Sequence, residues 1–179
     1  MNAKASPVIT QEIFDKWQKK IDLMAQIIDV PVGLIMKVHS AEIEVFVSSH
    51  TDGNPYQKGD REELNIGLYC ETVMATKKML EVPNATIDED WNRNPDIKLG
   101  MINYMGLPLL YPNGDLFGTV CILDSKQRKY SKLQMEILDH FKDSLEGDLQ
   151  LECEEIHLNQ VLKELKEIQT EKKQIENGI

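Results

Sequence analysis

The chain has 179 residues, of which 41% are hydrophobic and 28% charged, and its formal net charge is −10. This length fits one globular domain with an appendage, and the acidic charge argues against binding to nucleic acid or to a membrane surface. Three widely separated cysteines, no signal-peptide pattern and no apolar run near the ~20 residues of a membrane span predict a cytoplasmic protein without a disulfide framework.

The first elements are predicted to be a helix and a strand hairpin. Residues 1–8 are expected to be disordered. Apolar residues at spacings of three and four then predict a helix, which Thr10 can cap and Pro31 stops. Segments 32–38 and 43–48 are rich in β-formers, so we expect them to pair as a hairpin. The apolar stripe of the helix consists of Ile13, Trp17, Ile21, Met24 and Ile28.

Two polar loops are expected in the middle of the chain. Residues 50–63 contain two glycines, a proline and several charges, and a loop of this length in a compact domain is often functional or mobile. A short helix is expected at 66–78 and a brief strand at 80–82. Residues 88–97 are polar and broken by proline, with Trp91 in their middle, which indicates a loop or a frayed helical turn.

The strongest strand signal spans residues 104–123. Two apolar runs flank Pro112-Asn113-Gly114-Asp115, and Asn-Gly supplies the positive φ angles of a tight hairpin turn. Pro108 has no backbone N–H, so we expect a bulge or an unpaired edge position there. The predicted order α-β-β-α-β-β-β-α indicates an α+β fold, in which an antiparallel sheet carries helices on one face.

The last helix is predicted to be long and to change partners along its length. Ser131 and Gln134 form a capping box, and the helical pattern continues to Ile175 without proline. The apolar stripe changes register near Ile156, so we expect the helix to pack on the domain upstream and on a partner helix downstream. The alternative is that it folds back on its own domain. The downstream heptad seam is typical of a parallel coiled coil and consists of Leu158, Val161, Leu165, Ile168 and Ile175, with Lys172 as its polar member.

Several short motifs follow one another between residues 68 and 126. They read Tyr69-Cys70, Val82-Pro83-Asn84-Ala85, Asp88-Glu89-Asp90-Trp91 with Asn94-Pro95, Tyr104-Met105-Gly106-Leu107-Pro108-Leu109 and Gly118-Thr119-Val120-Cys121-Ile122-Leu123-Asp124. Their order and spacing resemble the GAF domain family of bacterial signalling proteins. The chain departs from the family pattern in one loop, where Asp90 and Trp91 replace an arginine and a phenylalanine.

The resemblance implies a domain organisation and a ligand site. Residues 9–150 would form a GAF-like antiparallel sheet flanked by helices, with a small-molecule pocket opposite the helices. Residues 151–179 would form a coiled-coil signalling helix leading to an output domain absent from this sequence, commonly a diguanylate cyclase or a histidine kinase. A homodimer through the N- and C-terminal helices is expected, whereas the ligand and any cofactor stay unidentified. The expected ligand-binding residues are Tyr69, Cys70, Val73, Asp90, Trp91 and Tyr104.

Three functional hypotheses follow. The first is a regulatory module that senses a small molecule and signals through the paired helix, and the second is a dimerisation module whose pocket is filled by its own side chains. The third is a thiol-based redox sensor or reductase through Cys70, since a helix start can lower a thiol pKa, although buried cysteines such as the expected core residue Cys121 are usually inert. No catalytic constellation occurs, so the chain itself is not expected to be an enzyme. Cys153 and His157, four residues apart on the last helix, would supply only half a metal site, and no metal is expected.

Overall fold

The computed structural model describes residues 9–178, and the expected disorder of residues 1–8 lies outside this range. The elements confirm the predicted α+β class. In chain order they are α1 (Gln11–Ile28), β1 (Val32–Val38), β2 (Glu42–Ser48), β3 (Arg61–Glu63), α2 (Tyr69–Thr76), β4 (Leu80–Val82), the 3-10 turns η1 (Ala85–Ile87) and η2 (Pro95–Leu99), β5 (Asn103–Leu110), β6 (Leu116–Asp124) and α3 (Lys132–Asn177).

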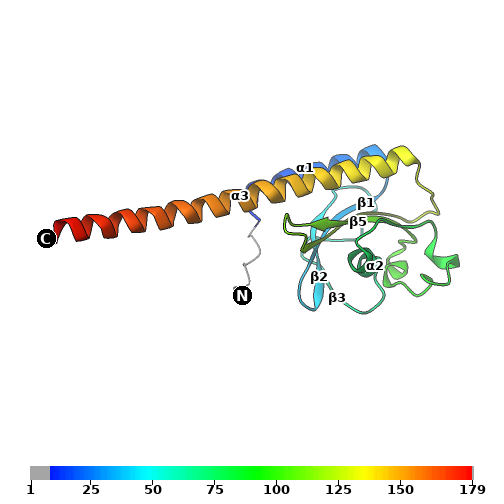
Figure 1. Cartoon of the computed structure of the whole chain (residues 1–179). Coiled ribbons are helices and arrows are strands. Elements are labelled where there is room, and N and C mark those ends of the chain that lie inside the picture. The colour runs from blue at the N-terminus through cyan, green and yellow to red at the C-terminus, as the bar shows by residue number, and fades with distance from the viewer. Residues whose placement is uncertain (1–8, 179) are drawn as a thin grey trace.

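The sheet has the strand order β3-β2-β1-β6-β5-β4, and every neighbouring pair is antiparallel. Helices α1 and α3 lie side by side over one face of this sheet, while α2 and the turns η1 and η2 lie on the other (Figure 1). Alternate residues of one strand therefore enter two different cores. In β6, Val120 and Ile122 face α1 and α3, whereas Cys121 and Leu123 face α2.

Two local predictions need correction. The segment 50–63 is not loop throughout, because Arg61–Glu63 pairs with β2 as the edge strand β3. The helix expected at 66–78 is shorter, since Gly67 at a φ of 89° precedes the N-cap Leu68 and Lys77 ends the helix in the left-handed region. The three residues of β3 are all charged and exposed, so the strand lacks the apolar alternation by which a strand is predicted from sequence.

The hairpin between β5 and β6 also differs in detail. Only Gly114 uses a positive φ angle, of 84°, so the turn is a three-residue loop rather than an Asn-Gly type I′ turn. The Tyr111 N–H donates to the Asp115 carbonyl at 2.8 Å and closes it. The unpaired edge position expected at Pro108 is confirmed, because β4 pairs with β5 only as far as Gly106. The irregularity in the pairing of β5 with β6 lies one residue further along, between Leu109 and Leu110.

Helix α3 is continuous and extends far beyond the domain (Figure 1). Its start has the predicted capping box, in which Ser131 and Gln134 each accept the other's backbone N–H. Leu138, Leu145 and Leu149 are buried against the core, and from Glu154 to Glu176 every side chain is exposed. The helix therefore leaves the domain at about the point where its apolar register changes. No helix in residues 9–178 is long and apolar enough to cross a membrane.

Candidate ligand cavity

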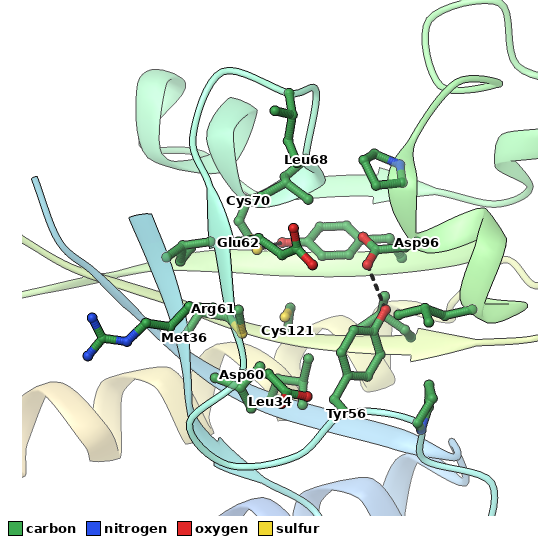
Figure 2. Close-up of a pocket in the computed structure, with 18 of the residues that line it drawn as sticks. Leu34, Met36, Tyr56, Asp60, Arg61, Glu62, Leu68, Cys70, Asp96 and Cys121 are labelled. Carbon is green, nitrogen blue, oxygen red and sulfur yellow. Dashed lines mark hydrogen bonds between the residues drawn. The ribbon is translucent and has the colours of Figure 1, made fainter. Parts of the chain in front are cut away.

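A cavity of about 740 Å³ lies between the sheet and the loops on the face opposite α1 and α3. Its roof comes from segments 50–66 and 86–100, which include the polar loops expected at 50–63 and 88–97, together with the start of α2. Its floor is the α2-facing side of the sheet, where Figure 2 shows Leu34 and Met36 of β1. The apolar side chains that strands β1, β2 and β6 supply to this floor are Leu34, Met36, Ile43, Val45 and Leu123.

Charged side chains of both signs surround this apolar floor. The set comprises Asp60, Arg61, Glu62, Arg93, Asp96 and Lys98. The guanidinium of Arg61 is engaged by Glu42 and Glu44 of β2, at 3.1 and 3.2 Å, and points away from the cavity (Figure 2). Within residues 9–178, Arg93 and Lys98 form no ion pair at all. The rim can therefore offer both a free cation and a carboxylate to a polar ligand.

The two roof loops are joined by one hydrogen bond. The Tyr56 hydroxyl donates to the Asp96 carboxylate at 2.8 Å, and both residues line the cavity (Figure 2). Burial raises the pKa of the Asp96 carboxyl, and the hydrogen bond from Tyr56 offsets part of that shift. The Asn94 side chain positions Asp96 by accepting its backbone N–H at 2.9 Å. We call the Tyr56–Asp96 contact the loop clasp.

Three aromatic rings connect the sheet to the second loop. Tyr104 of β5 stacks on Tyr69 of α2, with ring centroids 4.6 Å apart, and Tyr69 meets Trp91 at 5.1 Å. Tyr104 lies flat because Gly106, two residues along the strand, has no side chain, and a Cβ there would lie 2.1 Å from the Tyr104 hydroxyl oxygen. In the described part of the chain, the buried Tyr69 hydroxyl has no hydrogen-bond partner.

One end of the cavity holds a cluster of sulfur and hydroxyl groups. The Thr119 hydroxyl of β6 donates to Cys70 Sγ at 3.2 Å, and the Tyr104 hydroxyl lies 3.5 Å from the same sulfur. Cys121, two residues after Thr119 on the same face of β6, also lines the cavity. A hydrogen bond between the two thiols lowers the pKa of Cys70 and raises that of Cys121, and burial raises both.

The six residues predicted to bind the ligand separate into two groups. Cys70 and Tyr104 line the cavity, whereas Tyr69 and Val73 lie behind them in the core. Trp91 packs on Tyr69 from the outside, so its ring supports the wall. Asp90 is exposed on the outer loop, where its N–H donates to the Asp88 carboxylate at 3.0 Å.

The sequence did not predict the charged residues of the cavity rim or the two residues of the loop clasp, Tyr56 and Asp96. A signal for each existed, because Tyr56 is the one aromatic residue in the loop at 50–63 and Asp96 directly follows Asn94-Pro95. Neither sequence position indicates which loop the side chain will face, so the hydrogen bond between Tyr56 and Asp96 could not be predicted without the fold. Among residues 9–178 no group of three or more His, Cys, Asp or Glu side chains is placed to hold a metal ion.

The model of the GAF domain family matches residues 18–147. Solved structures of similar fold include the phycocyanobilin-bound GAF domain of a cyanobacterial phytochrome, with a TM-score of 0.69 and 13% identity over 81% of this chain and 88% of that one. The GAF domain of an Acinetobacter phosphoenolpyruvate-protein phosphotransferase gives a TM-score of 0.62 and 18% identity over 76% and 81% of the two chains. A comparison with curated protein sequences found no match.

An enzyme shares the same fold. The type II free methionine-R-sulfoxide reductase from Thermoplasma acidophilum has a TM-score of 0.60 and 13% identity, over 76% of this chain and 92% of that one. Similarities at this level of identity define the fold and leave the ligand open. The family match covers most of the chain, so the protein belongs to the GAF domain family, whose members are generally sensory and regulatory modules.

Proposed function

We propose that this chain is the regulatory, small-molecule-sensing module of a longer signalling protein and is not itself an enzyme. The cavity beneath the two loops carries this proposal, because it combines an apolar floor with a few convergent polar groups, which is typical of ligand sites. In this proposal the module acts in the cytoplasm and passes its signal along α3 to an output domain such as a diguanylate cyclase or a histidine kinase.

The rim indicates the chemistry of the ligand. Arg93 and Lys98 supply cations without ion-pair partners in the described range, and Asp96 supplies a half-buried carboxylate. A ligand with an apolar body and at least one charged group would use both the floor and the rim. Its entry would require the loop clasp to open, since Tyr56 and Asp96 both line the cavity and join its two roof loops.

Two contacts support transmission from the sheet to α3. The Glu146 carboxylate accepts the Leu110 N–H at 2.9 Å, so the end of β5 is attached to the helix. Asp148 accepts the Trp17 indole N–H at 3.0 Å and pairs with Lys16 and Lys20, which fixes α3 to α1. A shift of the sheet on ligand binding would therefore move α3 relative to α1.

The exposed half of α3 favours a homodimer, in which the same helix of a second copy of the chain covers the heptad seam. Leu158, Leu165 and Ile168 of the heptad seam are 57%, 50% and 60% exposed, and an apolar stripe of this length rarely faces water. Leu23 and Ile27 of α1 are also half exposed, so the dimer would use both helices. Such a dimer would place two output domains next to each other.

A thermal-shift screen of metabolites, followed by native mass spectrometry of the purified chain, tests the proposal. We expect a compound to raise the midpoint of unfolding of the wild type but not of Ile66→Trp, because Ile66 lines the mouth and a larger side chain would fill it. Ile87→Trp is the matched control, since Ile87 is 74% exposed and lies outside the cavity lining. A compound that stabilises both variants equally would show that it binds elsewhere.

A screen without any hit would favour the other hypothesis, a dimerisation module. Tyr56 and Tyr104 already occupy part of the space beneath the roof. In that case Ile66→Trp would leave both the unfolding midpoint and the oligomeric state unchanged, and only variants in the α3 seam would alter the protein.

A further inference from the structure

The two buried thiols of the cavity, Cys70 and Cys121, come from different elements and opposite sides of the space between α2 and the sheet. Cys70 is the second residue of α2, and Cys121 lies in the middle of β6, with Leu34 and Gly106 beside it on the neighbouring strands. Figure 2 shows both side chains in the middle of the view among the residues that line the cavity. They are 8% and 1% exposed.

Two hydroxyl groups converge on the Cys70 sulfur. Thr119 donates at 3.2 Å and the Tyr104 hydroxyl lies at 3.5 Å, while Cys121 lines the same cavity from β6. Donors of this kind stabilise a thiolate more than a neutral thiol, and the first turn of a helix adds its partial positive charge. The hydrogen bonds outweigh burial, so the pKa of Cys70 is lowered while that of Cys121 is raised.

The two thiols therefore have different roles available to them. Cys70 reaches the cavity surface with a stabilised thiolate, which is the form that attacks an electrophile. The raised pKa keeps Cys121 protonated, and Cys121 faces the same cavity from the sheet, where it could act as a second, resolving thiol. The 8% exposure of Cys70 admits only a small oxidant.

We propose that Cys70 and Cys121 form a reversible disulfide site that reacts with small hydroperoxides. The Cys70 thiolate attacks the outer oxygen of the hydroperoxide, an S–O bond forms, the O–O bond breaks, and the alkoxide or hydroxide leaves and takes a proton. Cys121 then attacks the resulting sulfenic acid, an S–S bond forms, and the hydroxyl leaves as water with the Cys121 proton. The hydroperoxide is reduced by two electrons and the two thiols are oxidised by two.

The disulfide would bind the start of α2 to the middle of the sheet. It would fix the roof of the cavity and displace the hydrogen bonds that Thr119 and Tyr104 now make to Cys70. This site depends on side chains of the chain itself, so it stands whether or not a ligand binds in the cavity.

The test begins with the wild-type chain and hydrogen peroxide in modest excess, with free thiols then blocked. Non-reducing peptide mapping is expected to find Cys70 joined to Cys121, with a loss of two hydrogens from the intact mass that dithiothreitol restores. Cys121→Ser is expected to stop at the sulfenic acid of Cys70, which a dimedone-type probe traps, and Cys70→Ser is expected to give neither product.

Cys153→Ser is the matched control, because Cys153 lies on α3 outside the cavity and its replacement should leave the disulfide unchanged. Thr119→Val keeps the shape of Thr119 but removes its donor, so the oxidation of Cys70 should slow by about fivefold. Circular dichroism shows whether each variant is folded. Free Cys70 and Cys121 after peroxide, or oxidation at Cys153 first, would overturn the proposal, and the wild-type result decides this without any variant.

Discussion

At the scale of single residues, Gly106 leaves the space that the Tyr104 ring occupies in the wall of the cavity. The ring of Tyr104 lies across it, stacks on Tyr69, and presents its hydroxyl to the Cys70 sulfur. Any side chain at position 106 would occupy the space of the phenol. The absence of a Cβ at one strand position therefore allows both the aromatic stack and the hydrogen bond at the end of the cavity.

Gly106→Ala should lower the free energy of unfolding by about 2 kcal/mol, because the new methyl group forces Tyr104 out of its stacked position. Urea unfolding followed by circular dichroism measures this. Gly147→Ala is the control, since a Cβ at Gly147 meets no atom within 4 Å and the same change in a helix should stabilise the chain by about 1 kcal/mol. Equal effects of the two substitutions would contradict the account of Tyr104.

The residues of the cavity show what sequence can and cannot supply. Cys70 and Tyr104 were predictable because they belong to motifs with fixed spacing. Tyr56 and Asp96 are 40 residues apart in the chain, and only the folded conformation of the two loops brings them within hydrogen-bond distance. Contacts of that kind depend on loop conformation, which turn residues restrict but do not determine.

At the scale of elements, the joint between α1 and α3 depends on one carboxylate. The Asp148 side chain is only 6% exposed and accepts from Lys16, Lys20 and the Trp17 indole. Burial acts to raise the pKa of Asp148, but these donors together lower it below the ordinary value. The ionised carboxylate is thus bound more tightly in the folded chain than in the unfolded one.

Asp148→Asn should reduce the free energy of unfolding at pH 7 by about 2 kcal/mol, because two lysines lose their charged partner. The lowered pKa fixes the sign of the pH dependence. The contribution of Asp148 is complete above the ordinary aspartate pKa of about 3.9 and is lost as the pH falls below it. Chemical denaturation at a series of pH values should show the wild type and variant converging in acid. A difference that persists undiminished to pH 2, which is about two pH units below that value, would contradict this.

The loop clasp predicts a local effect without global unfolding. Tyr56→Phe removes the donor to Asp96, so the loop at 50–63 should exchange its backbone hydrogens faster, by about fivefold for a hydrogen bond of this kind. Hydrogen exchange read by mass spectrometry checks this. Exchange in α3, which has no hydrogen bond or ion pair to residues 50–63 in the described part of the chain, serves as the internal reference. Unchanged exchange in the loop would show that the Tyr56–Asp96 hydrogen bond does not restrain it.

Element boundaries were predictable where side chains form caps. Thr10 and Ser131 begin α1 and α3 as expected, because each accepts a backbone N–H of the first turn. The edge strand β3 was not predictable, because its three residues are charged and it exists only through pairing with β2. The hairpin turn was placed correctly, but its type depends on Gly114 alone.

At the scale of the whole molecule, α3 joins a compact domain to a protruding helix. The register change near Ile156 was readable in the sequence, because the apolar spacing breaks there, and the structure leaves every side chain from Glu154 to Glu176 exposed. Nothing within the described part of this chain covers the heptad seam from Leu158 to Ile175. Pairing of two copies stays a prediction, and it has a direct test.

Leu165→Lys with Ile168→Lys should convert the proposed dimer to a monomer, because two charges per chain would enter the seam. Light scattering of the purified protein measures the mass. The matched control, Gln160→Lys with Thr170→Lys, adds the same charge at two exposed positions outside the seam and should stay dimeric. A dimer that survives the seam variant would place the interface elsewhere.

The central claim joins the cavity to α3, and hydrogen exchange of the full chain with and without a stabilising compound tests both ends at once. We predict slower exchange in the roof loops, 50–66 and 86–100, together with altered exchange in the part of α3 that packs on the domain, 132–153. The Ile66→Trp variant should show neither change. Protection confined to segments outside the cavity lining, or protected loops with an unaltered α3, would contradict the account.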